Sequence, residues 1–362
     1  MSNDYKFEGW LCKDKNSMKG EMEWGTFEPK HFEEDDVDFK IMFCGICASD
    51  IHTASSGWFD LGDLYPQVVG HEIVGKVTRV GSKVTHVKVG DIVGVGAQND
   101  SCLDCSQCKS HEESYCDKGQ CGTYAGRYYR QANSKGDKSY GGYATYHRAP
   151  AHFVVPIPKD LDPALAAPML CGGVTCYSPL VRYGAGTKAK DVGIVGIGGL
   201  GHFGLLFASA LGANVTAISH SESKKADAEK MGATRFIATH GSEDAFKGHE
   251  RSLDLIIATT NDSDMPLTGY LSLLRPHGHL ILVGAPEKPL PQIPAFPLIL
   301  NNVHIAGSAI GSPKVIKEML ELASKQKINS WIEKVPMNKA NQAILDMQAS
   351  KARYRYVLVA DE

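Results

Sequence analysis

Residues 191–204, with the sequence DVGIVGIGGLGHFG, join one apolar run to another through a turn rich in glycine. Three of its glycines, Gly196, Gly198 and Gly201, form the pattern G-x-G-x-x-G between a predicted strand and a predicted helix. The first glycine of such a turn permits a tight bend, the second lets the backbone approach a pyrophosphate, and the third lets the helix pack on the strand. N–H groups at the start of the helix can bind the anion. The stretch favours a dinucleotide-binding turn over a turn without a ligand, with binding residues Gly196, Gly198, Gly199, Leu200 and Gly201.

The segment 157–314 around this turn alternates short apolar runs with helical stretches. Repeated strand–helix–strand units imply a parallel sheet with helices on both faces. We therefore predict an α/β fold with a doubly wound, six-stranded parallel sheet. The proline-rich segment 284–297 is expected to be a loop. The expected strands are residues 192–195, 215–219, 235–238, 253–258, 279–283 and 303–306.

The N-terminal part of the chain, residues 1–156, has a different pattern. Short apolar runs lie between glycine turns, as in QVVGHEIVGKVTRVG at 67–81, which is typical of short β-strands. Near the C-terminus, residues 312–326 predict a helix and residues 353–360 predict a strand. The chain therefore combines a β-rich part with an inserted α/β part.

The end of the second predicted α/β strand bears on the choice of dinucleotide. A site for NAD usually has Asp or Glu there to bind the ribose 2′-hydroxyl. This chain has Ser219, His220 and Ser221 at that point, and Lys224 follows. These groups can surround a 2′-phosphate, which favours NADP(H). The alternative is an ordinary polar start of a helix.

Four cysteines lie close together in the lobe at about 100–116, with the spacing C-x2-C-x2-C-x7-C. Four thiolates in one short segment are the ligand set of a closed, tetrahedral zinc site. Disulfides and chance clustering are the alternatives, and a reducing cytosol disfavours disulfides. The predicted structural zinc ligands are Cys102, Cys105, Cys108 and Cys116.

Further possible ligands are spread along the chain. Cys47 lies in the run FCGICASDIH, His71 in VVGHEIVG and Cys171 in PMLCGGVTCYSP. Each alone is more consistent with a structural role in the core than with a metal site. Together, two cysteines and one histidine can form a catalytic zinc site with an open fourth position. Glu72, next to His71, is a candidate for a supporting carboxylate or a transient fourth ligand.

Composition limits the class of protein. The chain has 362 residues, of which 43% are hydrophobic and 22% charged, with a net charge of −3. This charge gives no reason to expect nucleic acid or an anionic membrane as a partner. The N-terminal residues lack the pattern of a signal peptide, and no apolar run reaches the about 18 residues that a membrane span needs. We expect a cytoplasmic protein that acts on small molecules.

These motifs together resemble the zinc-dependent medium-chain dehydrogenases/reductases, and most closely their cinnamyl alcohol dehydrogenase group with its fungal broad-range NADP alcohol dehydrogenases. The resemblance implies a GroES-like catalytic domain from residues 1–156 and 315–362 and a Rossmann domain at 157–314. It also implies NADP(H), two zinc ions per chain and a homodimer. The segments that carry it are GICASDIH, GHEIVGKV, the four-cysteine lobe, HFVVPIP, LAAPMLCGGVTCYSPL, VGIVGIGGLGHFG and RYRYVLV.

The resemblance assigns roles to individual residues. It implies that Cys47, His71 and Cys171 hold the catalytic zinc, and that Ser49 passes a proton through the cofactor ribose to His52. It implies that Thr175 faces the nicotinamide. Trp58 is a candidate wall of the substrate pocket, or simply a core residue.

The expected reaction is the interconversion of aldehydes and primary alcohols, with aromatic and longer-chain substrates preferred. One alternative is a polyol or sugar-alcohol dehydrogenase that uses NAD. Another is a non-catalytic zinc- and nucleotide-binding relative, and the presence of Cys47, Ser49, His52, His71 and Cys171 argues against it.

Overall fold

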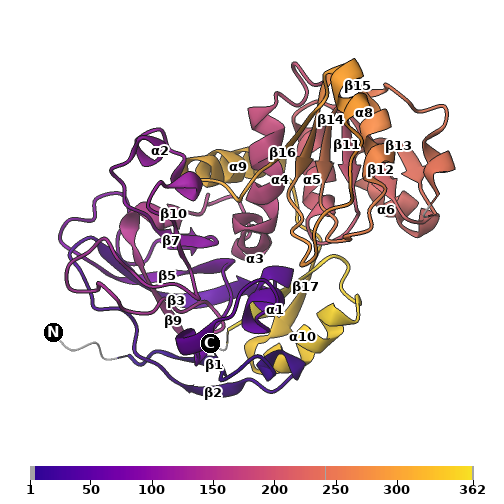
Figure 1. Ribbon diagram of the computed structural model, residues 1–362. Helices are drawn as coiled ribbons and strands as arrows, with labels where there is room; N and C mark the ends of the chain where they lie inside the picture. The colour runs from indigo at the N-terminus through magenta and orange to yellow at the C-terminus, as the bar shows by residue number, and fades with distance from the viewer. Residues whose placement is uncertain (1–4, 241, 361–362) are drawn as a thin grey trace. The chain divides into compact units, whose positions relative to one another are not determined.

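The computed structural model describes residues 5–240 and 242–360, which form two compact units. Unit 1 comprises residues 1–171 and 311–362, and unit 2 comprises residues 172–310. The sequence predicts domain boundaries at 156/157 and 314/315. These boundaries are those of the family's two domains, and they stay predictions. Figure 1 shows the chain as a ribbon, with labels on many of its helices and strands.

Unit 2 is built on one parallel sheet of six strands, in the order β13-β12-β11-β14-β15-β16. The prediction of a six-stranded, doubly wound parallel sheet is confirmed, and each expected strand overlaps an observed one. The strands are β11 Asp191–Val195, β12 Asn214–Ser219, β13 Ala233–Ala238, β14 Leu253–Ala258, β15 Leu274–Leu282 and β16 His304–Gly307.

Helices cover both faces of this sheet. Gly204 packs on Ile194 of β11, whereas the adjacent Val195 belongs to an apolar cluster that includes Leu271. Successive residues of a strand point to opposite faces, so the helices that carry Gly204 and Leu271 lie on opposite faces. The helices of unit 2 are α4 Gly172–Arg182, α5 Gly201–Ala210, α6 Lys225–Lys230, α7 Leu267–Ser272 and α8 Ala295–Asn301, with short 3-10 turns η6 Glu222–Lys224 and η7 Glu243–Phe246.

The proline-rich segment differs in part from its prediction. It is a loop as far as Pro294, but α8 begins at Ala295 and contains Pro297 in its first turn. Proline is tolerated there because the N–H groups of a first helical turn have no partner within the helix. The number of prolines in 284–297 therefore overstates the length of the loop.

Unit 1 is β-rich. Its largest sheet has the order β10-β6-β5-β3-β18-β17, and β9 also pairs with β3. A second sheet has the order β2-β1-β4, and β7 pairs with β8. The strands are β1 Glu8–Cys12, β2 Glu23–Thr26, β3 Asp36–Gly45, β4 Gln67–Val68, β5 Ile73–Val80, β6 Ile92–Val95, β7 Gln98–Asp100, β8 Cys121–Gly122, β9 Tyr146–Pro150, β10 Val155–Pro156, β17 Ile332–Pro336 and β18 Arg355–Val359.

The helices of unit 1 are short, except for one near the C-terminus that the sequence predicts at 312–326. That helix, α9, spans Pro313–Gln326, and Ser312 caps its start by accepting a hydrogen bond from the N–H of Val315. The others are α1 Ala48–Ala54, α2 Ser106–Lys109, α3 Pro163–Ala166 and α10 Ala340–Gln348, with 3-10 turns η1 Ser17–Lys19, η2 Gly62–Leu64, η3 Glu113–Tyr115, η4 Ala151–Phe153, η5 Ala167–Leu170 and η8 Met337–Lys339.

No single helix in the described residues is both long and apolar enough to cross a membrane. The consecutive segments Pro163–Leu170 and Gly172–Arg182 meet the length and composition criteria only when taken together, and the chain bends between them.

Candidate metal and cofactor sites

Four of the predicted site residues come together in unit 1. The ligand atoms of Cys47, His71, Glu72 and Cys171 all lie within 4.8 Å of one another, and all four residues are buried. The sheet explains this convergence, because Cys47 follows β3 and the His71–Glu72 pair precedes its neighbour β5. Cys171 follows η5, which packs against both strands.

A capping interaction fixes the backbone at Cys47. Cys47 is the N-cap of α1, and its N–H donates to Oδ2 of Asp50 at 2.9 Å. The side chain of Cys47 in turn lies at the N–H of Asp50, so the pair forms a capping box with cysteine in place of serine or threonine. The C-x-x-D spacing is the signal by which the sequence could have revealed Asp50.

Asp50 also orients the histidine of the cluster. Its Oδ1 lies 2.8 Å from Nδ1 of His71, and its Oδ2 accepts a hydrogen bond from the hydroxyl of Tyr143 at 2.9 Å. Nε2 of His71 is buried and has no hydrogen-bond partner among the described residues. A buried imidazole nitrogen without a partner is costly unless a ligand takes it up. Nε2 of His71 and the two thiols therefore fit a zinc ion.

The charges in the cluster favour the ligand form of Cys47. The hydrogen bond from Cys171 and the nearby His71 hold the pKa of Cys47 well below its ordinary value. Burial alone would lower the pKa of His71, but Asp50 and Cys47 raise it well above its ordinary value. Thiolate is the form of cysteine that binds metals, so the site is ready for a cation.

Glu72 forms a buried ion pair with Arg355, the first residue of β18. Burial raises the pKa of Glu72 to about 7 despite the opposing charge of Arg355. Gly45 makes room for this carboxylate, because a Cβ there would lie 2.0 Å from Oε2 of Glu72. The sequence gives no signal for Gly45 or Arg355, since 283 positions separate Arg355 from Glu72.

The predicted proton-relay residues lie on or near α1. Oγ of Ser49 is 3.6 Å from Sγ of Cys47. The ring of His52 stacks on that of Trp58, with 5.0 Å between centroids and 20° between planes. Both rings are partly exposed, so the structure does not place Trp58 in the core. Their roles toward a substrate stay predictions.

The four-cysteine lobe forms the second cluster, with its sulfur atoms within 4.8 Å of one another. Backbone N–H groups point at the sulfurs: Cys102 accepts from the N–H of Cys105 at 3.3 Å, and Cys105 accepts from that of Cys108 at 3.5 Å. Sγ of Cys105 and Sγ of Cys116 are 4.0 Å apart, about twice the length of a disulfide bond. All ten cysteines are free thiols. The arrangement fits a closed zinc site.

The glycine-rich turn of unit 2 has the shape that a bound pyrophosphate needs. Gly196 has a φ of +83°, which favours glycine, and a Cβ on Gly201 would lie 1.7 Å from the carbonyl oxygen of Gly196. A Cβ on Gly198 would meet no atom within 4 Å, so the backbone is open there. Leu200 is the N-cap of α5 and its carbonyl accepts a hydrogen bond from Cys176 of α4 at 3.2 Å.

The predicted 2′-phosphate residues lie beside this turn. Ser219 ends β12, and Nζ of Lys224 donates to the carbonyl oxygen of Ile197 at 2.6 Å, which holds the ammonium group next to the turn. Oγ of Ser221 lies 3.0 Å from that of Ser223. Ser223 was not predicted as a cofactor-binding residue, although it lies only two positions from Ser221.

Two further residues, His220 and Thr175, are predicted to bind the cofactor. His220 is exposed after β12, and its carbonyl oxygen accepts a hydrogen bond from the N–H of His240 at 2.7 Å. Thr175 is buried in α4 of unit 2. That Thr175 faces the nicotinamide stays a prediction.

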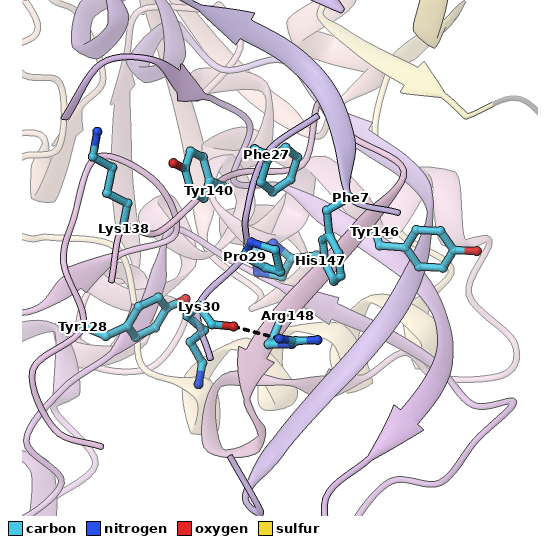
Figure 2. A pocket seen from close by; sticks show the side chains of 10 residues that line it. All are labelled: Phe7, Phe27, Pro29, Lys30, Tyr128, Lys138, Tyr140, Tyr146, His147 and Arg148. Atoms are coloured by element: carbon cyan, nitrogen blue, oxygen red, sulfur yellow. Dashed lines mark hydrogen bonds between the residues drawn. The ribbon is translucent and has the colours of Figure 1, made fainter. Parts of the chain in front are cut away.

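A separate cavity of about 10 Å³ in unit 1 contains none of these residues (Figure 2). Aromatic rings surround it, and at its edge the carbonyl oxygen of Lys30 accepts a hydrogen bond from Nη1 of Arg148. A cavity of this size holds about one water molecule. It is therefore no candidate for the reaction site.

Comparisons with known proteins give the family of the chain. The family described as alcohol dehydrogenase GroES-like domain matches residues 33–159, and that described as zinc-binding dehydrogenase matches residues 199–325. The chain is 44% identical to 8-hydroxygeraniol dehydrogenase of Catharanthus roseus, with 97% of this chain and 94% of the relative covered. It is 42% identical to a probable mannitol dehydrogenase of Fragaria ananassa, with 98% of this chain and 95% of the relative covered. It is 41% identical to NADP-dependent alcohol dehydrogenase 6 of Saccharomyces cerevisiae, with 99% of this chain and 98% of the relative covered.

Solved structures show the same likeness. A cinnamyl alcohol dehydrogenase of Sorghum bicolor superimposes with a TM-score of 0.90 at 36% identity, and 98% of both chains are covered. The enzyme named CAD from Helicobacter pylori, solved in complex with NADP(H), gives 0.87 at 34% identity, again with 98% of both chains covered. The predicted GroES-like and Rossmann domains are confirmed. The chain belongs to the zinc-dependent medium-chain dehydrogenase/reductase superfamily, in its cinnamyl alcohol dehydrogenase group.

Proposed function

We propose that this protein uses NADP(H) to interconvert aldehydes and primary alcohols at the cluster of Cys47, His71 and Cys171, and that it prefers aromatic and longer-chain substrates. Oxidoreduction of alcohols and aldehydes is the chemistry of the family to which the chain belongs. The observation that carries the proposal is the buried set of two thiols and Nε2 of His71, all within 4.8 Å and with no hydrogen-bond partner for Nε2 in the described chain.

When bound, Zn²⁺ polarises a carbonyl group and NADPH supplies a hydride. The residues of the chain position these groups and exclude water. Asp50 holds the ring of His71 so that Nε2 stays directed at the thiols. Glu72, paired with Arg355, keeps a buried carboxylate within 4.8 Å of the ligand atoms of Cys47, His71 and Cys171.

A proton has to reach the alcohol oxygen in the reductive direction. Ser49 supports this step because its hydroxyl lies next to Sγ of Cys47, and therefore next to the reacting position. His52 lies three residues farther along α1, on the same side of the helix as Ser49. Imidazole is the side-chain group most often used in general acid–base catalysis. We infer that the proton passes from His52 toward Ser49; when NADP(H) is bound, the hydroxyl groups of its ribose would complete this path.

NADP(H) is proposed over NAD(H) on the residues after β12. Ser219, Ser221 and Lys224 offer hydroxyl and ammonium donors, and the strand does not end in an acid. A 2′-phosphate gains charge-assisted hydrogen bonds from such groups. The NADP(H) complex of the related Helicobacter pylori enzyme supports this choice.

Aromatic and longer-chain aldehydes are proposed because the partly exposed Trp58 offers apolar surface beside His52. Burial of apolar substrate surface contributes about 25 cal/mol per Å², which favours a ring over a two-carbon chain.

Polyol oxidation is the second candidate, and the relative named probable mannitol dehydrogenase supports it. A panel of cinnamaldehyde, benzaldehyde, acetaldehyde and sorbitol with both cofactors tests the choice, and kcat/KM higher for sorbitol would overturn the aldehyde assignment.

We also propose that the chain forms a homodimer in the cytoplasm. Three side chains of α8 are largely exposed, with 71% of Phe296, 69% of Ile299 and 75% of Leu300 accessible. β16 lies at the edge of the sheet, where β15 is its neighbour in the described chain. An exposed apolar patch beside an open strand edge favours association, and a second copy offers the same two features. Light scattering should give twice the mass of one chain, and Ile299→Asp should lower it.

A further inference from the structure

The turn that follows α1 brings Trp58 back onto the helix, beside His52. The helix ends in a Schellman motif, in which the N–H of Gly57 donates to the carbonyl oxygen of His52 at 2.8 Å and the N–H of Ser56 donates to that of Thr53 at 3.0 Å. Such a motif usually has glycine at its left-handed position, but this chain has Ser56 there, with a φ of +56°. The chain therefore reverses at Ser56, and Trp58 lies next to the last turn of the helix.

The side chain of Ser56 secures this turn. Its Oγ accepts a hydrogen bond from the N–H of Leu61 at 3.4 Å and lies 3.1 Å from the hydroxyl oxygen of Tyr65. Tyr65 in turn donates its hydroxyl proton to the carbonyl oxygen of Ala54 at 2.6 Å. Glycine would adopt the same φ more easily but could make neither side-chain contact. The segment from Ser56 to Tyr65 is thus tied to the end of α1, and Trp58 lies within it.

The ring of Trp58 restrains an imidazole that would otherwise turn freely. The χ2 torsion of histidine has a broad energy profile, so the backbone of α1 does not fix the orientation of the His52 ring. His52 is also partly exposed, which leaves room for rotation. The two rings stack with 20° between planes and 5.0 Å between centroids, an arrangement that is favourable for aromatic rings. Rotation about χ2 of His52 would break this parallel contact.

We propose that Trp58 is a positioning residue for proton transfer, and that its stacking holds the imidazole of His52 in the orientation that serves Ser49. The inference rests on the proposed role of His52 and gives Trp58 a task besides that of apolar surface for the substrate. General acid–base catalysis needs the donor within hydrogen-bond reach, and a misplacement of about 1 Å can cost about 100-fold in rate. A residue that only lines a pocket affects the KM of large substrates, whereas a positioning residue affects kcat for small and large substrates alike.

Trp58→Leu, which keeps an apolar side chain but removes the ring, is the first test. We expect kcat to fall about tenfold for acetaldehyde as well as for cinnamaldehyde, and the solvent isotope effect on kcat to rise because proton transfer becomes slower. Trp58→Phe restores a ring that can stack and should recover most of the rate. Phe59→Leu, which changes the neighbouring ring, 51% exposed, is the matched control and should leave kcat unchanged. Zinc content and circular dichroism confirm that the variants are folded.

A double-mutant cycle shows whether Trp58 acts through His52. Trp58→Leu should lower kcat less than about twofold when His52→Gln is already present, because the ring then has no imidazole to position. A tenfold loss in both backgrounds would overturn the proposal. So would an unchanged kcat in Trp58→Leu, or a change confined to the KM of cinnamaldehyde, while His52→Gln alone is slow. If His52→Gln alone keeps wild-type turnover, the proposed role of His52 in the reaction is refuted, and the role of Trp58 with it.

Discussion

Oδ1 of Asp50 lies 2.8 Å from Nδ1 of His71, and this contact decides which ring nitrogen of His71 faces the two thiols. Asp50 is completely buried, and it also accepts hydrogen bonds from the N–H groups of Cys47 and Gly70 and from the hydroxyl of Tyr143. One carboxylate therefore connects the start of α1, the turn before β5 and the histidine ligand. Its removal should disturb the metal site more than any other change outside the ligands.

Asp50→Asn tests this relationship. The amide keeps the size of the side chain but accepts hydrogen bonds less strongly and orients His71 poorly. We expect zinc affinity and kcat/KM to fall about 10- to 100-fold, as for other residues that support a metal ligand. Competition with a chelator gives the affinity, and steady-state kinetics give the turnover. Tyr143→Phe, which removes one of several donors to Asp50, is the control and should change both values much less. Equal effects of the two variants would contradict the special role of the contact with His71.

The two clusters should hold one zinc each. Cys105→Ser should reduce the zinc content from about two ions per chain to about one and lower the thermal stability, because a zinc ion that binds only the folded lobe stabilises it. Cys171→Ala should lose the other zinc while the fold remains. Elemental analysis measures the zinc content of both variants, and circular dichroism measures their fold and thermal stability. Cys12→Ala, which changes a buried cysteine outside the clusters, should retain two zinc ions. A wild type with one zinc after gentle purification would refute the prediction.

Lys224 should discriminate between the cofactors. Lys224→Ala should raise KM for NADPH by about tenfold and leave KM for NADH nearly unchanged, because only NADPH carries the 2′-phosphate. Lys225→Ala removes an exposed lysine at the next position and should affect neither value strongly. Ser219→Asp should shift the preference toward NADH by repelling the phosphate and accepting the ribose hydroxyl. A wild type that prefers NADH would show that this site is misassigned.

His147 should make the fold sensitive to acid. Burial lowers the pKa of His147 to about 3, although a hydrogen bond to the backbone of Tyr140 opposes this. The unfolded chain binds a proton at this residue below about pH 6.5, whereas the folded chain does so only near pH 3. The free energy of unfolding should therefore fall as the pH falls through this window, by up to about 1.4 kcal/mol per pH unit.

Denaturant unfolding between pH 4.5 and 7.5 measures this effect, and His147→Gln should make the fall less steep than in the wild type. His249→Gln, which changes an exposed histidine, should leave it unchanged. Release of zinc at low pH affects all three proteins alike. Parallel pH profiles of wild type and His147→Gln would therefore refute the assignment to His147.

The sequence predicts the parts of this protein whose chemistry is local. The glycine pattern at 196–201 and the alternating apolar runs predict the parallel sheet, and the cysteine spacing at 102–116 predicts a compact cluster. The open cluster required family resemblance, because Cys47, His71 and Cys171 are far apart in the chain. Asp50, Gly45 and Arg355 were not predicted. Their roles depend on the pairing of β3 with β5 and β18, which the order of residues does not reveal.

The cluster of Cys47, His71 and Cys171 is proposed to reduce aldehydes with NADPH. Its most direct test is kcat/KM for cinnamaldehyde with NADPH, set against kcat/KM for sorbitol with NAD⁺, in enzyme whose zinc content has been measured. We expect cinnamaldehyde with NADPH to be preferred by at least about 100-fold, equivalent to about 2.7 kcal/mol in transition-state binding, and Cys171→Ala to abolish the activity. A preference for sorbitol and NAD⁺, or no turnover of either substrate by the zinc-loaded wild type, would contradict the account.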